Sequence, residues 1–417
     1  MGAENPPLTI PFALPFIGKE EEEAALRVLR SGWLTTGKEA LAFEEEFAAF
    51  LGVTGEKNSL RCLAVNSATS GLHLALEAAG LGPGDLALVP AYTFTSTAEV
   101  VRYLGAETVF VDCAPGSFNM DPAALEKTLQ RLEAGLPPYP RGSGEGFGPR
   151  GRPKAVLPVH FGGLPCDMDA IMTIARKYDL RVIEDAAHAF PSKIAPDTYA
   201  GTTGDAGVFS FYATKTITTG EGGMVVCRDP AMAERISRMR LHGIDRNVWN
   251  RYTDAKASWY YEVQDAGYKY NMPDILAAIG RVQLTRAVDL LRQREEMAKC
   301  YDEAFSDEPA LILPPSGSGD ARHLYPLSLR QDRLKISRDV FIEKMKAEGI
   351  GVSVHFIPLH VMPYYKNRYG FVDDDFPQAL RNFKGEISLP LWPGMGEDKI
   401  ERVIAVVKTI LRNYTIL

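Results

Sequence analysis

Short apolar stretches alternate with helical patterns along residues 60–230. The strand-like stretches are 61–65, 86–90, 108–111, 154–159 and 181–183, and helical patterns over 70–79 and 96–104 separate the first three of them. Strands that alternate with helices in this way are typical of a mostly parallel sheet covered by helices. The pattern therefore predicts an α/β fold, in which ligands collect at the carboxyl ends of the strands.

A long helical pattern begins at Pro273 and continues toward Phe305, with apolar residues at helical spacing. We expect this helix to link a larger domain, residues 1–270, to a smaller C-terminal α/β domain, residues 271–417, because a chain of 417 residues exceeds the usual size of one core. The stretch 324–329 predicts the first strand of the smaller domain. Its internal proline predicts an edge position, since proline donates no ladder hydrogen bond.

Three further elements are expected in the smaller domain. Ser337 is suited to cap a helix over 339–348, and Gly349 is suited to end it. The stretch 352–356 predicts another strand. A C-terminal helix begins near Glu397 and carries apolar residues at helical spacing.

Glycine and proline dominate residues 137–153, a segment that also carries three arginines. Such a composition predicts a mobile surface loop rather than a regular element. We favour a solvated insertion over a lid on a substrate site.

Composition and charge exclude several classes of partner. Hydrophobic residues make up 46% of the chain, charged residues 24%, and the net charge is −7. This balance describes a globular protein and gives no support for binding to nucleic acid or to anionic membranes. No apolar run approaches the ~18 residues of a membrane span, and the N-terminus lacks the basic start and apolar core of a secretory signal. We therefore expect a cytoplasmic protein.

Cysteine and histidine spacing gives no sign of a metal site. The five cysteines are scattered and form no CxxC pair. This argues against a zinc site or a disulfide framework, and most of them are expected to be buried small hydrophobes in a reducing compartment. The seven histidines show no metal-ligand spacing either, so we expect no metal.

The strongest chemical signal is an aspartate and a lysine in strand-rich surroundings. Asp185 follows a predicted strand, and Lys215 lies at the end of the segment 209–215. Lysine can bind pyridoxal 5'-phosphate (PLP) covalently, and a nearby carboxylate can keep the pyridine nitrogen of PLP protonated. Each residue alone fits a structural role at least as well, as a helix cap or a surface lysine. Together, in these flanking sequences, they favour a PLP site.

Small hydroxylated residues at a predicted helix start are candidates for the phosphate of such a cofactor. Thr69 and Ser70 precede a helical pattern, and free N–H groups and the helix dipole favour an anion there. Ser210 is a further candidate donor. A plain helix cap is the alternative interpretation. The segment around Thr69 and Ser70 contains no GxGxxG motif, and the glycine-rich segment 220–223 lacks the lysine of a P-loop, so nucleotide-binding folds are disfavoured.

Aromatic and imidazole side chains complete the candidate set. Phe94 could stack on a pyridine ring, although a buried core position is the alternative. His188 could hydrogen-bond the phenolic oxygen of the cofactor. Among the other histidines, His355 and His360 are candidates for a substrate role, and the remaining ones are expected to be structural.

Taken together, these segments resemble the DegT–StrS family of sugar aminotransferases, which are fold-type-I PLP enzymes. The resemblance covers nearly the whole chain, from residues 31–37 to residues 388–393. Its most specific parts are 182–188, the segment around Lys215, and 267–274. The resemblance implies a homodimer with shared active sites.

The resemblance also implies a role for the three central residues. Lys215 would be the lysine that binds PLP covalently, and it would move the proton between substrate and cofactor carbons. Asp185 would be the partner of the pyridine nitrogen. His188 would contact the phenolic oxygen O3'.

The remaining roles concern the phosphate and the ring. By resemblance, Thr69, Ser70 and Ser210 would contact the phosphate, and Phe94 would stack on the ring. Asn271 would reach the phosphate of the neighbouring subunit's cofactor.

The implied reaction is transfer of an amino group, with glutamate as the expected donor, to a keto sugar linked to a nucleotide. We prefer a 4-keto hexose because the segment 242–271 resembles that of 4-aminotransferases. Some relatives carry histidine in place of the lysine and act as dehydratases, so Lys215 favours transamination. Two alternatives stay open: a transaminase of a cyclitol or free ketone, and a non-catalytic PLP-binding regulatory protein. The loop 137–153 is longer than is usual in the family.

Overall fold

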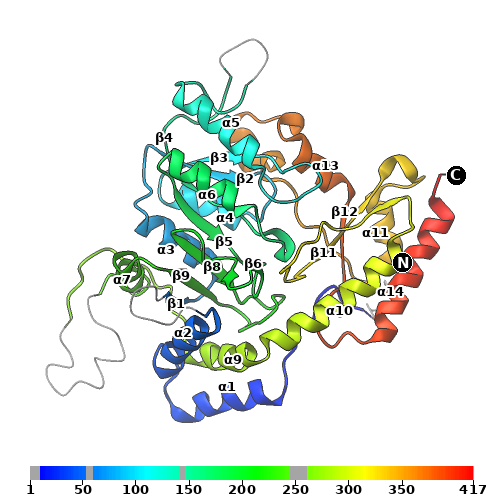
Figure 1. Ribbon diagram of the computed structural model, residues 1–417. Helices are drawn as coiled ribbons and strands as arrows, with labels where there is room; N and C mark the ends of the chain where they lie inside the picture. Colours follow the sequence, from blue (N-terminus) through cyan, green and yellow to red (C-terminus); the bar gives the residue numbers. More distant parts are fainter. Residues whose placement is uncertain (1–9, 53–59, 141–145, 245–260, 417) are drawn as a thin grey trace, which may run out of the picture.

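A seven-stranded sheet forms the centre of the larger part of the molecule (Figure 1). The computed structural model describes residues 10–52, 60–140, 146–244 and 261–416. In sheet order the strands are β1 (Arg61–Val65), β9 (Gly223–Cys227), β8 (Ala206–Ser210), β5 (Arg181–Asp185), β4 (Arg152–Val156), β2 (Asp85–Pro90) and β3 (Glu107–Val111). Of these strands, β9 is antiparallel to both neighbours and all other pairs are parallel. The predicted α/β fold with a mostly parallel sheet is confirmed.

Helices cover both faces of this sheet. They are α2 (Lys38–Phe50), α3 (Ala68–Ala78), α4 (Ser96–Tyr103), α5 (Pro122–Glu133), α6 (Met168–Lys177), α7 (Pro230–Met239) and α9 (Asp274–Thr285), and α1 (Lys19–Ser31) packs on the outside of α9. Successive side chains of a strand point to opposite faces, so a strand covered on both sides is apolar throughout. In β9, Val225 and Cys227 pack into the core with α3 and α7, whereas Met224 and Val226 pack with α2 and α9.

The smaller part contains an antiparallel sheet of three strands. In sheet order these are β10 (Leu311–Ile312), β11 (Tyr325–Leu329) and β12 (Glu386–Leu389). The helices beside it are α10 (Ala287–Phe305), α11 (Arg338–Ala347) and α14 (Glu397–Tyr414), and they share one apolar core with the sheet. Two shorter helices, α12 (Pro363–Tyr369) and α13 (Pro377–Gly385), and a hairpin of β6 (Lys193–Ala195) and β7 (Thr198–Tyr199) complete the fold.

The edge position predicted for the proline-containing strand is wrong. That strand, β11, lies in the middle of the smaller sheet. β10 pairs only with Leu329 and Ser328, so it ends before it reaches Pro326. The proline therefore needs no ladder hydrogen bond on that side, and its missing N–H is tolerated in a central strand.

The strand predicted over 352–356 is also wrong, apart from a single bridge between Ser353 and Ser388. Backbone groups of His355 bond to side chains instead of a neighbouring strand. Its N–H donates to Glu386 Oε2 (2.8 Å), and its carbonyl accepts from the Tyr92 hydroxyl (2.6 Å). These two hydrogen bonds replace the backbone hydrogen bonds that a strand would make with a neighbouring strand.

The single long helix predicted from Pro273 is divided at Arg286 into α9 and α10. The two helices serve different cores, since α9 packs against α1 and α2 whereas α10 crosses to the smaller sheet (Figure 1).

Other predictions of elements are confirmed. The Ser337 side chain accepts a hydrogen bond from Val340 N (3.3 Å) and caps α11, and α14 begins at Glu397.

The domain division between residues 270 and 271 stays a prediction. Chain beyond residue 271 contributes to the core of the larger part as well as to that of the smaller one. In the larger part, Ala277 and Leu284 of α9 pack with Phe43 and Phe47 of α2. The segment 359–379 packs beside β3.

The ends of the segment 137–153 are anchored, which contradicts the prediction of a solvated loop for these residues. Tyr139 is buried, and its hydroxyl oxygen accepts the N–H of Phe110 (2.5 Å). The Tyr139 ring lies 5.2 Å from the rings of both Phe147 and Phe371. The tip, residues 141–145, lies outside the described residues.

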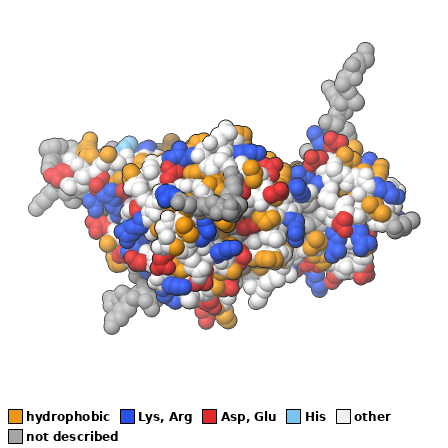
Figure 2. Space-filling view, turned by 90° about the horizontal axis from the view of Figure 1, so that it is seen from above, with side chains coloured by type: hydrophobic (Ala, Val, Ile, Leu, Met, Phe, Trp, Pro, Cys, Tyr) orange, Lys and Arg blue, Asp and Glu red, His pale blue; other side chains and the backbone are white. Residues whose placement is uncertain are grey.

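The surface carries charges of both signs. In the view from above, Lys and Arg side chains are interspersed with Asp and Glu over the visible face (Figure 2). Among the described helices, none is both long and apolar enough to cross a bilayer.

Asp274 joins the start of α9 to the start of α2. Its buried carboxylate accepts the backbone N–H groups of Gly37 (2.7 Å), Glu39 (3.2 Å) and Ala40 (3.0 Å). The first N–H groups of a helix have no partner within the helix, so this carboxylate satisfies them from a distant part of the chain.

We predict that Asp274→Ala lowers the free energy of unfolding by about 2–4 kcal/mol, because it leaves several buried donors unpaired. Urea unfolding at fixed protein concentration measures the change. The control is Asp289→Ala on the exposed side of α10, for which a change within about 0.5 kcal/mol is expected. Equal losses in the two variants would contradict the assignment.

Candidate active site

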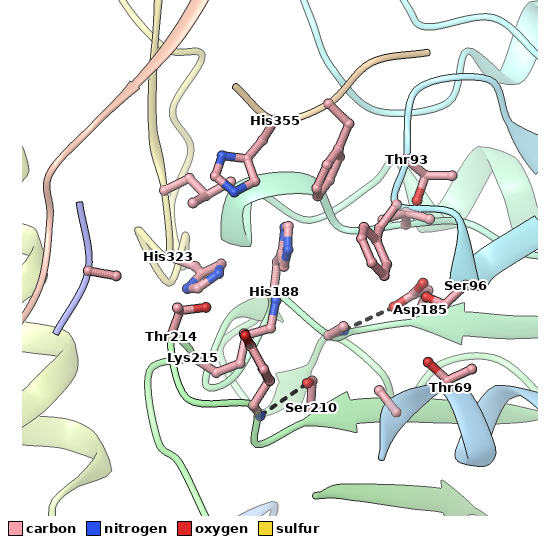
Figure 3. A pocket seen from close by; sticks show the side chains of 18 of the residues that line it. Thr69, Thr93, Ser96, Asp185, His188, Ser210, Thr214, Lys215, His323 and His355 are labelled. Atoms are coloured by element: carbon pink, nitrogen blue, oxygen red, sulfur yellow. Dashed lines mark hydrogen bonds between the residues drawn. The ribbon is translucent and has the colours of Figure 1, made fainter. Parts of the chain in front are cut away.

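A cavity of about 430 Å³ opens at the carboxyl ends of β5 and β8 (Figure 3). The starts of α3 and α4 contribute to its lining, as expected for a mostly parallel sheet. His323, Phe356 and Leu389, from segments beside or within the smaller sheet, also line it. The cavity therefore lies where the two parts of the molecule meet.

Asp185 ends β5 and lines the cavity with its carboxylate buried (4% exposed). Oδ2 accepts from the Thr97 hydroxyl (2.8 Å), and Oδ1 accepts from Ala187 N (3.1 Å). Burial raises the pKa of Asp185, against the effect of these hydrogen bonds. Among the described residues no cation forms a salt bridge with it. A buried carboxylate that has no salt-bridge partner stabilises a cation placed beside it, such as a protonated pyridine nitrogen.

Lys215 lines the same cavity, and its amine has no hydrogen-bond or ion-pair partner among the described residues (Figure 3). Burial lowers the pKa of Lys215 to about 8, against the attraction of Asp185, and the buried Arg294 lowers it further. At neutral pH about a tenth of such an amine is uncharged, against far less for an ordinary lysine. The amine is therefore available as a nucleophile and proton carrier.

His188 presents one defined ring nitrogen to the cavity. The backbone N–H of Gly162 donates to Nδ1 (3.2 Å), so Nδ1 is unprotonated and Nε2 carries the proton. Burial lowers the pKa of His188 well below its usual value, and the charge of Lys215 adds to this effect. A neutral imidazole with an Nε2–H donor suits an oxygen of a bound molecule, as predicted for O3'.

Of the three candidate phosphate contacts near the start of α3 and the end of β8, two line the cavity and one does not. Thr69 at the start of α3 and Ser210 at the end of β8 both line the cavity. Ser210 Oγ accepts from Tyr212 N (3.3 Å), which leaves its own proton free to donate. Ser70 does not line the cavity; it is buried, and its hydroxyl donates to Asn66 Oδ1 (2.7 Å). The phosphate contact of Ser70 stays a prediction, and the hydroxyl of Ser70 is directed to Asn66 in this structure.

A glycine permits the close packing at the start of α3. A Cβ on Gly223 of β9 would lie 2.8 Å from Ala68 N, which is closer than such atoms approach. The absence of a side chain lets the strand pass directly beneath the helix start. The N–H groups of α3 are thus held at the rim of the cavity.

Phe94 lines the cavity and is 56% exposed, so it is not a buried core residue. Its ring lies 5.8 Å from that of Phe356 and is free to cover a planar group. Asn271 does not line the cavity of its own chain. Its amide donates to Thr36 Oγ1 (2.6 Å) and accepts from Lys269 Nζ (2.6 Å). Its role at a neighbouring subunit's cofactor stays a prediction.

Sequence patterns missed several residues of this cavity. His323 was expected to be structural, but it lines the cavity with its ring 4.6 Å from that of His188. Its Nδ1 is buried and has no hydrogen-bond partner among the described residues. Of the two histidines considered for a substrate role, His355 lines the cavity, whereas His360 is buried elsewhere with Nε2 on the Asp373 carbonyl (2.9 Å). The position of His323 directly before a predicted strand was the signal in the sequence that could have pointed to the cavity.

Comparison with known proteins identifies the family. Residues 15–408 match the DegT/DnrJ/EryC1/StrS aminotransferase family. The chain belongs to this family. It is 43% identical over 406 residues to the spore coat polysaccharide biosynthesis protein SpsC of Bacillus subtilis (strain 168), covering 97% of both chains.

Solved structures agree with this assignment. The fold matches Spr1654 of Streptococcus pneumoniae in its PMP form with a TM-score of 0.85, at 29% identity over 97% of this chain and 100% of that one. It matches Helicobacter pylori PseC, an aminotransferase involved in the biosynthesis of pseudoaminic acid, with a TM-score of 0.83, at 28% identity over 97% and 99% of the chains. Spr1654 has also been solved in a PLP form.

These findings confirm three predictions. The fold is that of fold-type-I PLP enzymes, the protein is a PLP-dependent aminotransferase, and its cofactor is PLP. The side chains present fit this group. The buried carboxylate of Asp185, which has no salt bridge to a described residue, suits a pyridinium nitrogen, and the amine of Lys215, which has no hydrogen-bond partner among those residues, lines the same cavity. The role of each site residue stays a prediction to be tested.

In the protein freed of cofactor, the side-chain amine of Lys215 should react with a small amine-reactive reagent at a lower pH than the side-chain amine of Nα-acetyl-lysine does. Its depressed pKa of about 8 means that the neutral, reactive amine forms as pH rises through that value. The labelling rate of the peptide that contains Lys215, followed by mass spectrometry against pH, tests this. A midpoint near that of N-acetyl-lysine would contradict it.

Thr97→Val should weaken PLP binding about tenfold or more, because the substitution removes a hydrogen bond to the Asp185 carboxylate while keeping the shape of the side chain. Titration of the cofactor-free protein with PLP measures the affinity. Thr173→Val, on the exposed surface of α6, is the matched control. Unchanged affinity in Thr97→Val would show that Asp185 does not depend on this contact.

Proposed function

We propose that the protein is a sugar aminotransferase that transfers the amino group of glutamate to a nucleotide-linked 4-keto hexose. The observation that carries the proposal is that Lys215, Asp185 and the Nε2–H side of His188 belong to one cavity. The family match supports transamination. The keto sugar, the nucleotide and the donor come from the resemblance of the sequence to the family.

Each central residue has a defined task in this proposal. When bound, PLP supplies an electron-withdrawing ring that makes the proton on the amine-bearing carbon removable. Lys215 Nζ takes that proton and returns it, which its lowered pKa permits near neutral pH. Asp185 holds a proton on the ring nitrogen by its negative charge. His188 donates from Nε2 to the phenolic oxygen.

The rest of the cavity suits a polyhydroxylated substrate. His323 and His355 are neutral near physiological pH because burial lowers the pKa of both. Neutral imidazoles exchange hydrogen bonds with hydroxyl groups, and aromatic faces such as Phe12 and Tyr212 can pack on a sugar ring. SpsC and PseC are associated by name with polysaccharide and with pseudoaminic acid biosynthesis. These two relatives support a sugar as acceptor.

The first half of the reaction is tested with the PLP-loaded enzyme and glutamate alone. We expect the visible absorbance of the bound cofactor to fall as the amino group is transferred. Lys215→Ala should abolish steady-state transamination, because no other side chain would move the proton. A Lys215→Ala protein that still transaminates would refute the central role of the lysine.

The acceptor is tested with a panel of UDP- and dTDP-linked 4-keto hexoses beside a cyclitol ketone and an unattached keto sugar. Recovery of the visible absorbance after glutamate treatment reports a productive acceptor. Recovery with the nucleotide-linked sugars supports the proposal. Recovery with the cyclitol ketone alone would instead support the alternative hypothesis of a transaminase that acts on a cyclitol or free ketone.

A further inference from the structure

A second buried carboxylate lies behind the wall of the cavity, on β12. Glu386 and Ser388 are both fully buried. The Ser388 hydroxyl lies 2.5 Å from Glu386 Oε1 and 2.8 Å from His355 Nδ1. A continuous chain of hydrogen bonds therefore runs from the carboxylate through the hydroxyl to an imidazole that lines the cavity.

His355 is held in place independently of its ring. Its backbone N–H donates to Glu386 Oε2 (2.8 Å), and its carbonyl accepts from the Tyr92 hydroxyl (2.6 Å). The Phe12 ring packs 5.4 Å from the imidazole. With Nδ1 directed at Ser388, Nε2 is the nitrogen left for the cavity, and among the described residues it has no partner (Figure 3).

The direction of each hydrogen bond in this chain depends on one proton. When Glu386 is ionised it can only accept, so the Ser388 proton points to Glu386 and the Ser388 oxygen must accept from His355. Nδ1 then carries the imidazole proton, and Nε2 is a bare acceptor. When Glu386 is protonated and donates to Ser388, the Ser388 proton turns to Nδ1, and Nε2 carries the proton instead.

We propose that Glu386 and Ser388 act as a relay that sets whether His355 presents a hydrogen-bond acceptor or a donor to the cavity. A proton that arrives at Nε2 is balanced by transfer of the Nδ1 proton to Ser388 and of the Ser388 proton to Glu386. The imidazole stays neutral before and after. His355 is thus a proton-exchanging group toward an oxygen of the acceptor substrate, and Glu386 and Ser388 are positioning residues.

The surroundings allow this exchange near physiological pH. Burial raises the pKa of Glu386 to about 8, against the hydrogen bonds from Ser388 and His355 and the charge of Arg338. Burial lowers the pKa of His355 to about 3, and the charge of Lys215 lowers it further. The carboxyl group therefore titrates where the imidazole stays neutral, so the relay changes the tautomer and not the charge of His355.

Three other titratable groups near this chain keep one state over that range. Burial raises the pKa of Tyr92, whose hydroxyl donates to the His355 carbonyl. Burial lowers the pKa of His188 and of His323 well below the usual value, and both face the cavity near His355. Near His355 both Glu386 and Lys215 have a pKa of about 8, and Glu386→Gln, which leaves Lys215 in place, separates their effects.

Glu386→Gln separates the two states of the relay. The backbone N–H of His355 needs an acceptor, so the amide oxygen takes the place of Oε2 and the amide NH₂ faces Ser388. The NH₂ group can only donate, so this variant should fix the relay in the direction that the protonated carboxyl gives. Ser388→Ala removes the hydroxyl and disconnects Glu386 from the imidazole.

The test is ¹⁵N NMR of the PLP-loaded enzyme with labelled histidine, with the His355 signals assigned by their loss in His355→Gln. In the wild type we expect Nε2 to lose its proton as pH rises through about 8, over about a unit on either side. In Glu386→Gln, Nε2 should keep its proton throughout, and in Ser388→Ala the pH dependence should disappear. A constant tautomer in the wild type, or an unchanged pH dependence in Glu386→Gln, would overturn the relay.

A kinetic measurement links the relay to the substrate, and this part rests on the proposed function. The KM for the keto sugar should vary with pH in the wild type, by up to about tenfold as one hydrogen bond changes direction. Glu386→Gln should abolish this variation while the glutamate half-reaction is unchanged. Failure of every sugar in the panel would refute the proposed acceptor but leave the NMR result intact, so the two proposals fail separately. Equal pH dependence of KM in the two proteins would refute the substrate contact.

Discussion

The site depends on a carboxylate that the fold buries with no salt bridge to any described residue. Asp185 lies at the end of a central strand, where Thr97 and the backbone of Ala187 donate to its oxygens, and Lys215 attracts it without forming an ion pair. A buried charge in this state is costly unless a partner arrives, and a protonated pyridine nitrogen is such a partner. Binding of PLP and stability of the site are therefore linked through one side chain.

Few other charges in the cavity compete with the pairing of Asp185 and a protonated pyridine nitrogen. Around Lys215 the imidazoles of His188, His323 and His355 are all kept neutral by burial, and the lysine itself is shifted toward its uncharged form. Positive charges in proximity raise the cost of each further proton. The cavity thus offers several neutral groups that exchange hydrogen bonds, together with one amine that changes protonation state near physiological pH.

The cavity is assembled from segments distant in the chain. The larger sheet supplies Asp185 and Ser210 at strand ends, whereas Phe12 comes from the N-terminal segment and His355 from the segment before α12. The chain beyond residue 359 returns to pack beside β3. Both parts of the molecule therefore contribute walls to one cavity.

Local patterns in the sequence determined five of the seven strands of the larger sheet and the cap at Ser337, and they singled out Asp185 and Lys215, which line one cavity. Apolar periodicity reports burial directly, and residues at the ends of parallel strands meet at one edge of a sheet. Only the tertiary structure decided the places of His323, Glu386 and Ser388, which lie more than 100 residues beyond Lys215 in sequence. It also decided that Pro326 lies in a central strand, since that depends on where a neighbouring strand ends. A local pattern carries no information about which distant group satisfies a hydrogen bond, so the contacts of His355 with Ser388 and Glu386 could not be predicted from it.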